Sequence, residues 1–236
     1  MRVSTIFFDF GGTLARLGID PHEVWTTVCD DFSLGVTQEA ILAANQEADR
    51  RFAGELFSYH GRTREFWRLR DMWVLEHLGV QDRREEVFEA LQRVFEDPTQ
   101  VHPYPESVRV LEALRSAGYR LGVISNFTDH LLPLLEFHGL RPFFGSVTYS
   151  QEVGVEKPDE QIFRRALERS GSPPEEAVHV GDSWEADVEG ARRSGLSPVW
   201  LDRSGGEEPR DCSTLHDLSG LRGVLERLEG RAPRPS

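Results

Sequence analysis

The sequence predicts an α/β fold in which a parallel sheet core is interrupted by an inserted helical domain. Short apolar runs alternate with longer amphipathic stretches at the start of the chain and after residue 106, a pattern typical of parallel strands joined by helices. Between these regions no run resembles a strand, and the amphipathic segments indicate helices. The 236 residues suffice for one substantial core and a smaller accessory domain.

The strands of the predicted sheet are short apolar runs that end at polar, charged or glycine residues. The first run extends from Val3 to Phe8 and ends at Asp9. The others share this character and span 120–124, 146–149, 177–180 and 198–201. Amphipathic stretches between them predict helices over 106–117, 129–138, 160–170 and 186–194.

The middle of the chain carries the aromatic residues of the predicted helical insert. These are more typical of a packed core than of cofactor contacts, and they include Trp25, Phe52, Phe57, Phe66, Trp67, Trp73 and Phe88. We expect the chain to pass between the two parts near 15–20 and 98–105, which gives a core of 1–15 with 100–229 and an insert of 16–99. The tail 230–236 has prolines and no apolar face, so we expect it to be disordered.

Composition excludes several classes of partner. A formal net charge of -13 disfavours nonspecific attraction to nucleic acid or to an anionic membrane. Cys29 and Cys212 are too few for a disulfide framework. No run is long and apolar enough to span a bilayer, and no signal-peptide pattern precedes the first strand. We therefore expect a cytoplasmic protein, whose oligomeric state the sequence leaves open.

The end of the first strand predicts a nucleophile. Asp9 follows an apolar run and precedes Gly11 and Gly12, which allow other groups to approach the backbone closely. A carboxylate in this position is suited to covalent catalysis on an electrophile. Thr13 is expected to hydrogen-bond within the turn and to hold it.

Two later segments supply groups that bind an anion. Ser125 and Asn126 follow the strand 120–124 with a hydroxyl and an amide that can hold an anionic oxygen. Lys157, which precedes Pro158, is the only lysine of the chain. Its compact ammonium suits a single phosphoryl oxygen, whereas a guanidinium favours bidentate pairing. The alternative is that one lysine remains by chance on a solvated loop.

Asp182 and Asp187 complete a set of carboxylates with Asp9. Carboxylates in one pocket repel one another unless a cation neutralises them. Oxygen ligands of this kind suit a hard divalent ion, and Mg2+ commonly lies between carboxylates and a substrate phosphate. For Asp187 the alternative that it caps or solvates a helix stays open. His179 lies inside an apolar strand, so we interpret it as a hydrogen-bonded core residue.

Taken in order, these segments resemble the motifs of the haloacid dehalogenase-like hydrolase superfamily. The resemblance rests on Asp9-Phe-Gly-Gly-Thr-Leu, Ser125-Asn126, Lys157-Pro158 and Gly181-Asp-Ser-x-x-x-Asp187, and it spans most of the chain. It implies a Rossmann-like core with a helical cap that selects the substrate.

The resemblance also implies a role for each site residue. Asp9 would attack phosphorus to form an aspartyl-phosphate, and Lys157 and Ser125 would bind the phosphoryl group, with Asn126, Gly12 and Thr13 beside them. The ligands of Mg2+ would be Asp9, Asp182 and the Gly11 carbonyl, and Asp187 would support the metal through water. The implied function is a phosphohydrolase acting on a small phosphorylated metabolite.

Gly11 departs from the family pattern. Most phosphatases of the superfamily carry an aspartate at this position as general acid and base, a role that contributes about 10²–10⁴-fold to the rate. We therefore expect slow turnover unless another group substitutes, such as one from the polar stretch 58–64 of the cap. A haloacid dehalogenase, a phosphonate-cleaving enzyme, and a ligand-binding or regulatory protein are the alternatives. The phosphonate-cleaving enzyme would need a cap lysine, which this chain lacks.

Overall fold

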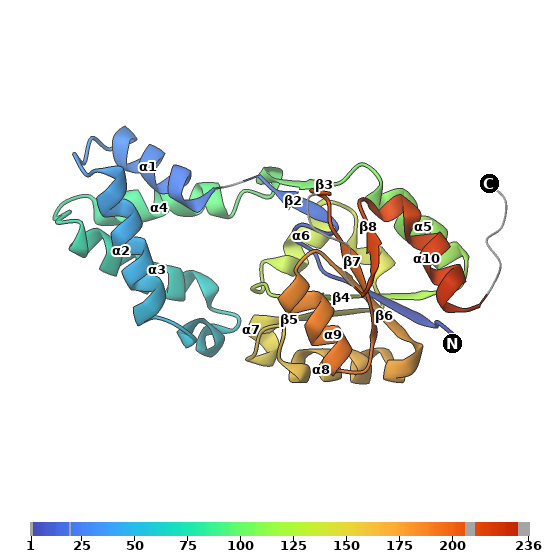
Figure 1. The fold of residues 1–236 in the computed structure, drawn as a ribbon. Helices are drawn as coiled ribbons and strands as arrows, with labels where there is room; N and C mark the ends of the chain where they lie inside the picture. The colour runs from blue at the N-terminus through green and yellow to red at the C-terminus, as the bar shows by residue number, and fades with distance from the viewer. Residues whose placement is uncertain (1, 19, 206–210, 231–236) are drawn as a thin grey trace. The chain divides into compact units, whose positions relative to one another are not determined.

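The computed structural model describes residues 2–18, 20–205 and 211–230 (Figure 1). The chain divides into two compact units, one formed by 1–16 with 103–236 and the other by 17–102. The first contains the large sheet, and the second is helical. Apart from Gly230, the tail expected to be disordered lies outside the described residues.

The first unit is built on a six-stranded sheet with the order β5-β4-β1-β6-β7-β8. Every neighbouring pair is parallel, which confirms the predicted α/β fold. The strands are β1 (Thr5–Phe8), β4 (Arg120–Ser125), β5 (Ser146–Tyr149), β6 (Ala177–Gly181), β7 (Ser197–Leu201) and β8 (Ser213–Leu215). From β1 the chain moves outward through β4 to β5, and it then returns to the opposite side of β1 as β6. The order therefore reverses at β1, and ligands of open α/β sheets bind at such a point.

Helices cover both faces of this sheet (Figure 1). They are α5 (Ser107–Ser116), α6 (Leu131–Phe137), α7 (Ser150–Val153), α8 (Glu160–Ser170), α9 (Gly190–Arg193) and α10 (Leu221–Leu228). Phe7 and Ile124 of the sheet pack in one buried cluster with Ile162 and Phe163 of α8 and Ala191 of α9. The alternate strand residues Ile6, Phe8 and Val123 are also fully buried. Burial on both sides explains why these strands are continuous apolar runs.

Several element boundaries differ from the prediction. The helix expected over 186–194 is a π-helical turn, Trp184–Glu189, followed by the short α9. The helix expected from Asp129 begins at Leu131, and α7 lies between β5 and Lys157. The sequence patterns predict no element beyond residue 201, whereas the structure has β8 and α10 there. A three-residue strand with half-buried side chains offers little periodicity to detect.

The second unit is a helical bundle. Its helices are α1 (Pro21–Asp31), α2 (Gln38–Arg51), α3 (Thr63–His77) and α4 (Arg84–Phe95), with shorter 3-10 turns at Glu55–Tyr59 and Pro98–Gln100. Their apolar faces meet in one cluster that includes Trp25, Ile41, Phe66, Leu75 and Leu91. Among the described residues, none of the helices of either unit is both long enough and apolar enough to cross a bilayer.

Each of the two chain crossings expected near 15–20 and 98–105 contains a short strand, and these two strands pair with each other. Strands β2 (Ala15–Leu17) and β3 (Val101–Pro103) form a small sheet of their own. Gly18 N donates to Gln100 O over 2.8 Å, and a Cβ at Gly18 would lie 2.6 Å from that oxygen. The sequence indicates a boundary near 98–105, but the strand pairing depends on residues more than eighty positions apart, which local composition does not reveal.

A buried polar network lies inside the helical unit. Arg70 donates to Asp71 over 3.0 Å and to Asp49 over 2.6 Å, and Gln92 donates to the second oxygen of Asp71 over 3.2 Å. Burial raises the pKa of Asp71 to about 6, although Arg70 and Gln92 both favour the carboxylate. Because the folded-state pKa exceeds the ordinary value, folded protein holds this proton more tightly than unfolded protein.

We expect Asp71→Asn to become more stable relative to the wild type as pH rises from about 4 to about 7. Ionised Asp71 carries a burial cost that asparagine avoids. A pKa raised by about two units corresponds to about 3 kcal/mol at 1.36 kcal/mol per unit. Chemical denaturation of both proteins across this pH range measures the difference in unfolding free energy. A difference that stays constant with pH would contradict the prediction.

Candidate active site

Functional side chains gather at the carboxyl ends of three adjacent strands of the core. Asp9 follows β1, Ser125 is the last residue of β4, and Asp182 follows β6. Because β1 lies between β4 and β6, these residues share one edge of the sheet at the point where the strand order reverses. Lys157, on the connection between α7 and α8, reaches the same place.

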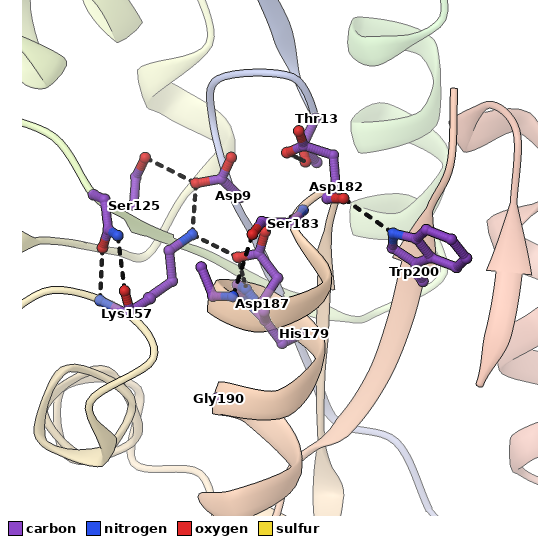
Figure 2. A network of polar contacts seen from close by, with 12 residues as sticks. Asp9, Thr13, Ser125, Lys157, His179, Asp182, Ser183, Asp187, Gly190 and Trp200 are labelled. Atoms are coloured by element: carbon purple, nitrogen blue, oxygen red, sulfur yellow. Dashed lines mark hydrogen bonds and ion pairs between the residues drawn. The ribbon is translucent and has the colours of Figure 1, made fainter. Parts of the chain in front are cut away.

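Lys157 joins two carboxylates in a buried network (Figure 2). Its Nζ donates to Asp9 Oδ1 over 2.7 Å and to Asp187 Oδ1 over 2.6 Å. Ser125 Oγ donates to Asp9 Oδ1 over 2.9 Å. The side chains of Lys157 and Asp187 are each 2% exposed, and that of Asp9 is 10% exposed. Asp9 is therefore the member of this network that solvent reaches most readily.

Burial and neighbouring charges set the pKa of each group. Burial raises the pKa of Asp9, against the opposing effect of Lys157. Burial also disfavours the Lys157 ammonium, but Asp187 and Asp9 outweigh it and raise the pKa of Lys157 to about 12. Burial acts to raise the pKa of Asp187 too, but Lys157 and His179 hold that pKa below its usual range. Lys157 therefore carries a permanent charge beside Asp9.

The Asn126 side chain holds the segment that carries Lys157. Its Oδ1 accepts a hydrogen bond from Lys157 N over 2.7 Å, and its Nδ2 donates to Lys157 O over 3.0 Å. Both polar ends of the amide are thus engaged by the main chain of one residue. The expectation that this amide also holds an anionic oxygen stays a prediction. Asn126 positions Lys157, and sequence spacing gave no signal for this pairing across 31 residues.

Residues 10–15, which we call the nucleophile turn, pack directly against Asp182. Gly12 has φ +79°, and a Cβ placed on it would lie 2.3 Å from Asp182 Oδ2. Thr13 Oγ1 donates to Asp182 Oδ1 over 3.2 Å, which agrees with the expectation that Thr13 holds the turn. Gly12 N donates to Ala15 O over 2.8 Å, a hydrogen bond within the turn. The close contact requires glycine at position 12.

His179 is buried and hydrogen-bonded, as the sequence predicts, and it also contacts the site. Its Nε2 lies 2.8 Å from Asp187 Oδ1, inside a fully buried stretch of β6. Ser183 N donates to the other carboxylate oxygen of Asp187 over 3.0 Å. A histidine two residues before Gly181 points to the same side of the strand as that glycine, and this alternation was the available signal. Asp187 is thus held by His179, Lys157 and the main chain.

Three carboxylates of the site could hold a metal ion. Asp9, Asp182 and Asp187 each offer an oxygen within 4.8 Å of the others. The α-carbon of Gly12 leaves room for the Asp182 carboxylate, which a larger residue would displace. Desolvation and the charges of Asp9 and Asp187 raise the pKa of Asp182 to about 6, which a bound cation would offset. This donor set fits a hard divalent cation.

The polar stretch 58–64 makes contacts inside the helical unit. Arg62 donates to Glu65 over 3.2 Å, and Arg64 pairs with Glu89 and Glu96. A group from this stretch is one candidate substitute for the missing acid. Its arginines are instead engaged by nearby glutamates, as expected of a solvated connection.

Together the fold and the site define an α/β enzyme of the hydrolase class, with its charged groups at the switch point of a parallel sheet. The chain belongs to the haloacid dehalogenase-like hydrolase family, whose model matches residues 3–195. This confirms the resemblance seen in the sequence motifs.

Similar proteins agree with this assignment. The chain is 31% identical over 245 residues to human haloacid dehalogenase-like hydrolase domain-containing protein 3, a match that covers 99% of this chain and 98% of that protein. It is 37% identical over 134 residues to glyceraldehyde 3-phosphate phosphatase of Methanothermobacter thermautotrophicus, covering 53% of this chain and 59% of the relative. The 2-haloacid dehalogenase of Pseudomonas syringae superposes with a TM-score of 0.72 at 24% identity, covering 95% of this chain and 99% of that one. At that identity the likeness shows the fold alone.

Proposed function

We propose that this protein is a Mg2+-dependent phosphohydrolase that cleaves a small organic phosphate through an aspartyl-phosphate at Asp9. The asymmetry of the Asp9 carboxylate carries the proposal. Lys157 and Ser125 both donate to Oδ1, whereas no residue in the described part of the chain donates a hydrogen bond to Oδ2. One oxygen is therefore held by a cation and a hydroxyl, and the other is left to act as the nucleophile.

The proposed reaction has two displacements at phosphorus. Asp9 Oδ2 attacks phosphorus, the bond to the leaving oxygen breaks, and that oxygen departs with the electron pair and takes a proton from solvent. Water then attacks phosphorus, the bond between phosphorus and Asp9 Oδ2 breaks, and the proton lost by the water passes to solvent. This step releases inorganic phosphate and regenerates the Asp9 carboxylate. The Lys157 ammonium and the Ser125 hydroxyl, already beside Asp9, stabilise charge on the phosphoryl oxygens in both steps.

The residues proposed to hold Mg2+ are Asp9, Asp182 and the carbonyl of Gly11. When bound, Mg2+ offsets negative charge on the phosphoryl oxygens and on the carboxylates. Both oxygens of Asp187 accept hydrogen bonds from protein groups. We therefore assign Asp187 to holding Lys157 in place and to contributing charge near the ion.

The test is phosphate release from an aryl phosphate by purified protein, with Mg2+ and with chelator. We expect metal-dependent release that Asp9→Asn abolishes. Release no greater than that of Asp9→Asn would overturn the proposal in favour of a ligand-binding or regulatory protein. Halide release from a 2-haloacid in the presence of chelator would overturn it in favour of a dehalogenase.

Gly11→Asp is expected to accelerate hydrolysis of alkyl phosphates by about 100-fold, the lower end of what a positioned acid or base contributes. The reason is that an alkoxide leaves poorly without a proton, and Gly11 has no side chain to supply one. Aryl and acyl phosphates, whose leaving groups need no acid, should gain less. Values of kcat for the three substrate classes provide the measurement.

Gly11→Asn is the matched control, because it adds a side chain of the same shape that cannot donate or accept the proton in this way. It should leave the preference among leaving groups unchanged. Equal acceleration of alkyl and aryl phosphates by Gly11→Asp would show that Gly11 does not limit protonation of the leaving group.

We also propose that the substrate is a small phosphorylated metabolite and that the protein is located in the cytoplasm. The name of the archaeal relative, glyceraldehyde 3-phosphate phosphatase, supports the substrate class. Cys29 and Cys212 are both free thiols, which is typical of a reducing compartment.

A further inference from the structure

An arginine outside the family motifs contacts the nucleophile turn. Arg203 lies two residues beyond the end of β7. Its Nε donates to Gly12 O over 3.0 Å, and its Nη2 donates to Thr13 O over 2.7 Å. The two carbonyls are adjacent along the chain, so one planar guanidinium donates hydrogen bonds to both peptide groups. This fork geometry is available to arginine and not to lysine.

The Arg203 guanidinium also forms an ion pair and stacks on an aromatic ring. Its Nη1 donates to Glu106 Oε1 over 2.9 Å, and its guanidinium carbon lies 3.4 Å from the centroid of the Tyr104 ring. The side chains of Arg203 and Glu106 are 19% and 13% exposed. A half-buried guanidinium that is ion-paired, stacked and doubly donating has little rotational freedom, and charge-assisted hydrogen bonds are stronger than neutral ones.

The segments on both sides of this contact are fixed. Asp202 Oδ1 accepts from Ser204 Oγ and from Gly205 N, which braces the loop that carries Arg203. On the other side, Leu14 O of the nucleophile turn accepts from Tyr104 N over 3.0 Å and from Ser107 Oγ over 2.7 Å. Three consecutive carbonyls of the turn, from Gly12 to Leu14, are therefore held by groups from distant parts of the core.

We propose that Arg203 is a positioning residue that holds the nucleophile turn in its working geometry. This inference rests on the proposed function. By fixing the Gly12 and Thr13 carbonyls, Arg203 keeps the Gly12 α-carbon against Asp182 and the Thr13 hydroxyl on the same carboxylate. It thereby sets the distance between Asp182 and Asp9, which precedes the turn. A displacement of about 1 Å at such a site lowers a rate by about 100-fold.

Arg203→Met tests the proposal, with Arg169→Met as the matched control. Arg169 is also half-buried and ion-paired, with Glu152, and it also donates to a main-chain carbonyl, that of Val147, over 3.0 Å. It makes no contact with the nucleophile turn among the described residues. Each variant is assayed for kcat and KM on an aryl phosphate, and for amide hydrogen exchange of the peptide that covers residues 9–15.

For Arg203→Met we expect kcat to fall by about 10- to 100-fold while KM changes by less than about threefold. Exchange of the 9–15 amides should rise by about tenfold, because the turn opens more often. Arg169→Met should show none of these effects.

An exchange rate of the 9–15 amides in Arg203→Met equal to that in Arg169→Met would overturn the proposal, as would an unchanged kcat. If Arg203→Met does not fold, Arg203→Lys decides, because it keeps the charge but loses the fork. A kcat and an exchange rate equal to those of the wild type in that variant would overturn the proposal. An inactive wild type would instead overturn the proposed function, and the exchange measurement would still show whether Arg203 holds the turn.

Discussion

Lys157→Met is expected to lower kcat on an aryl phosphate by about 1000-fold or more. The ammonium is the only cation in contact with Asp9 among the described residues, and removal of a single preorganised donor already costs about 10²–10³-fold. The Lys157 side chain is only 2% exposed, so loss of its full charge should lower kcat more than loss of a neutral donor does. Steady-state kinetics with saturating Mg2+ measures the effect.

The same change is expected to destabilise the fold. It leaves the buried carboxylates of Asp9 and Asp187 without their shared counter-ion, and breaking a buried pair in this way costs about 3–5 kcal/mol. Denaturant unfolding in chelator measures this loss separately from catalysis. Lys157→Arg is the matched control, because it restores charge but replaces a compact ammonium with a planar fork.

Lys157→Arg should therefore recover stability more fully than it recovers kcat. A Lys157→Met protein that retains more than a tenth of the wild-type kcat would exclude Lys157 from stabilising the phosphoryl oxygens. Recovery of kcat in Lys157→Arg to the wild-type value would show that only charge is required at this position.

Gly12→Ala is expected to lower kcat by about 100-fold or more, because the added methyl group displaces a proposed metal ligand. Its Cβ would lie 2.3 Å from Asp182 Oδ2 and 2.6 Å from Asp182 Cγ, so the carboxylate must move. The left-handed backbone, φ +79°, adds about 1–2 kcal/mol of strain for alanine. Assays of kcat and of Mg2+ affinity by calorimetry should both show the displacement.

Gly118→Ala is the control that introduces backbone strain without a steric clash. Gly118 has φ +90°, and a Cβ placed there meets nothing within 4 Å. It should therefore lose only the stability that backbone strain costs, about 1–2 kcal/mol, while keeping its kcat and its affinity for Mg2+. If Gly12→Ala and Gly118→Ala have the same kcat, the contact between position 12 and Asp182 has no part in the reaction.

The sequence predicted the layout of the core because that layout follows from local patterns. Strands buried on both faces are continuous apolar runs, and the predicted run 146–149 coincides with β5. Parallel strands have their carboxyl ends at one edge, so residues that follow such runs are brought close together. For this reason Asp9, Ser125 and Asp182 could be assigned to one site without knowledge of the register.

The missed elements have weaker local signals. The strands β2, β3 and β8 contain three residues each, too few for an alternating pattern to be recognised. The π-helical turn at Trp184–Glu189 depends on the Ser183 side chain, which accepts from Ala186 N, and on the buried Asp187 carboxylate. A helical pattern in a sequence assumes uniform α-helical turns, so it does not reveal a single π-helical turn.

The sequence by itself determined the fold class, the family and the kinds of groups at the site. Only the tertiary structure decided which of these groups touch. The Lys157 ammonium donates a hydrogen bond to Asp9, 148 positions away in the sequence. Arg203 donates one to Gly12 of the nucleophile turn, 191 positions away. The physical reason is that burial and periodicity act on neighbours along the chain, whereas a hydrogen bond between side chains depends on distances that arise when the sheet assembles.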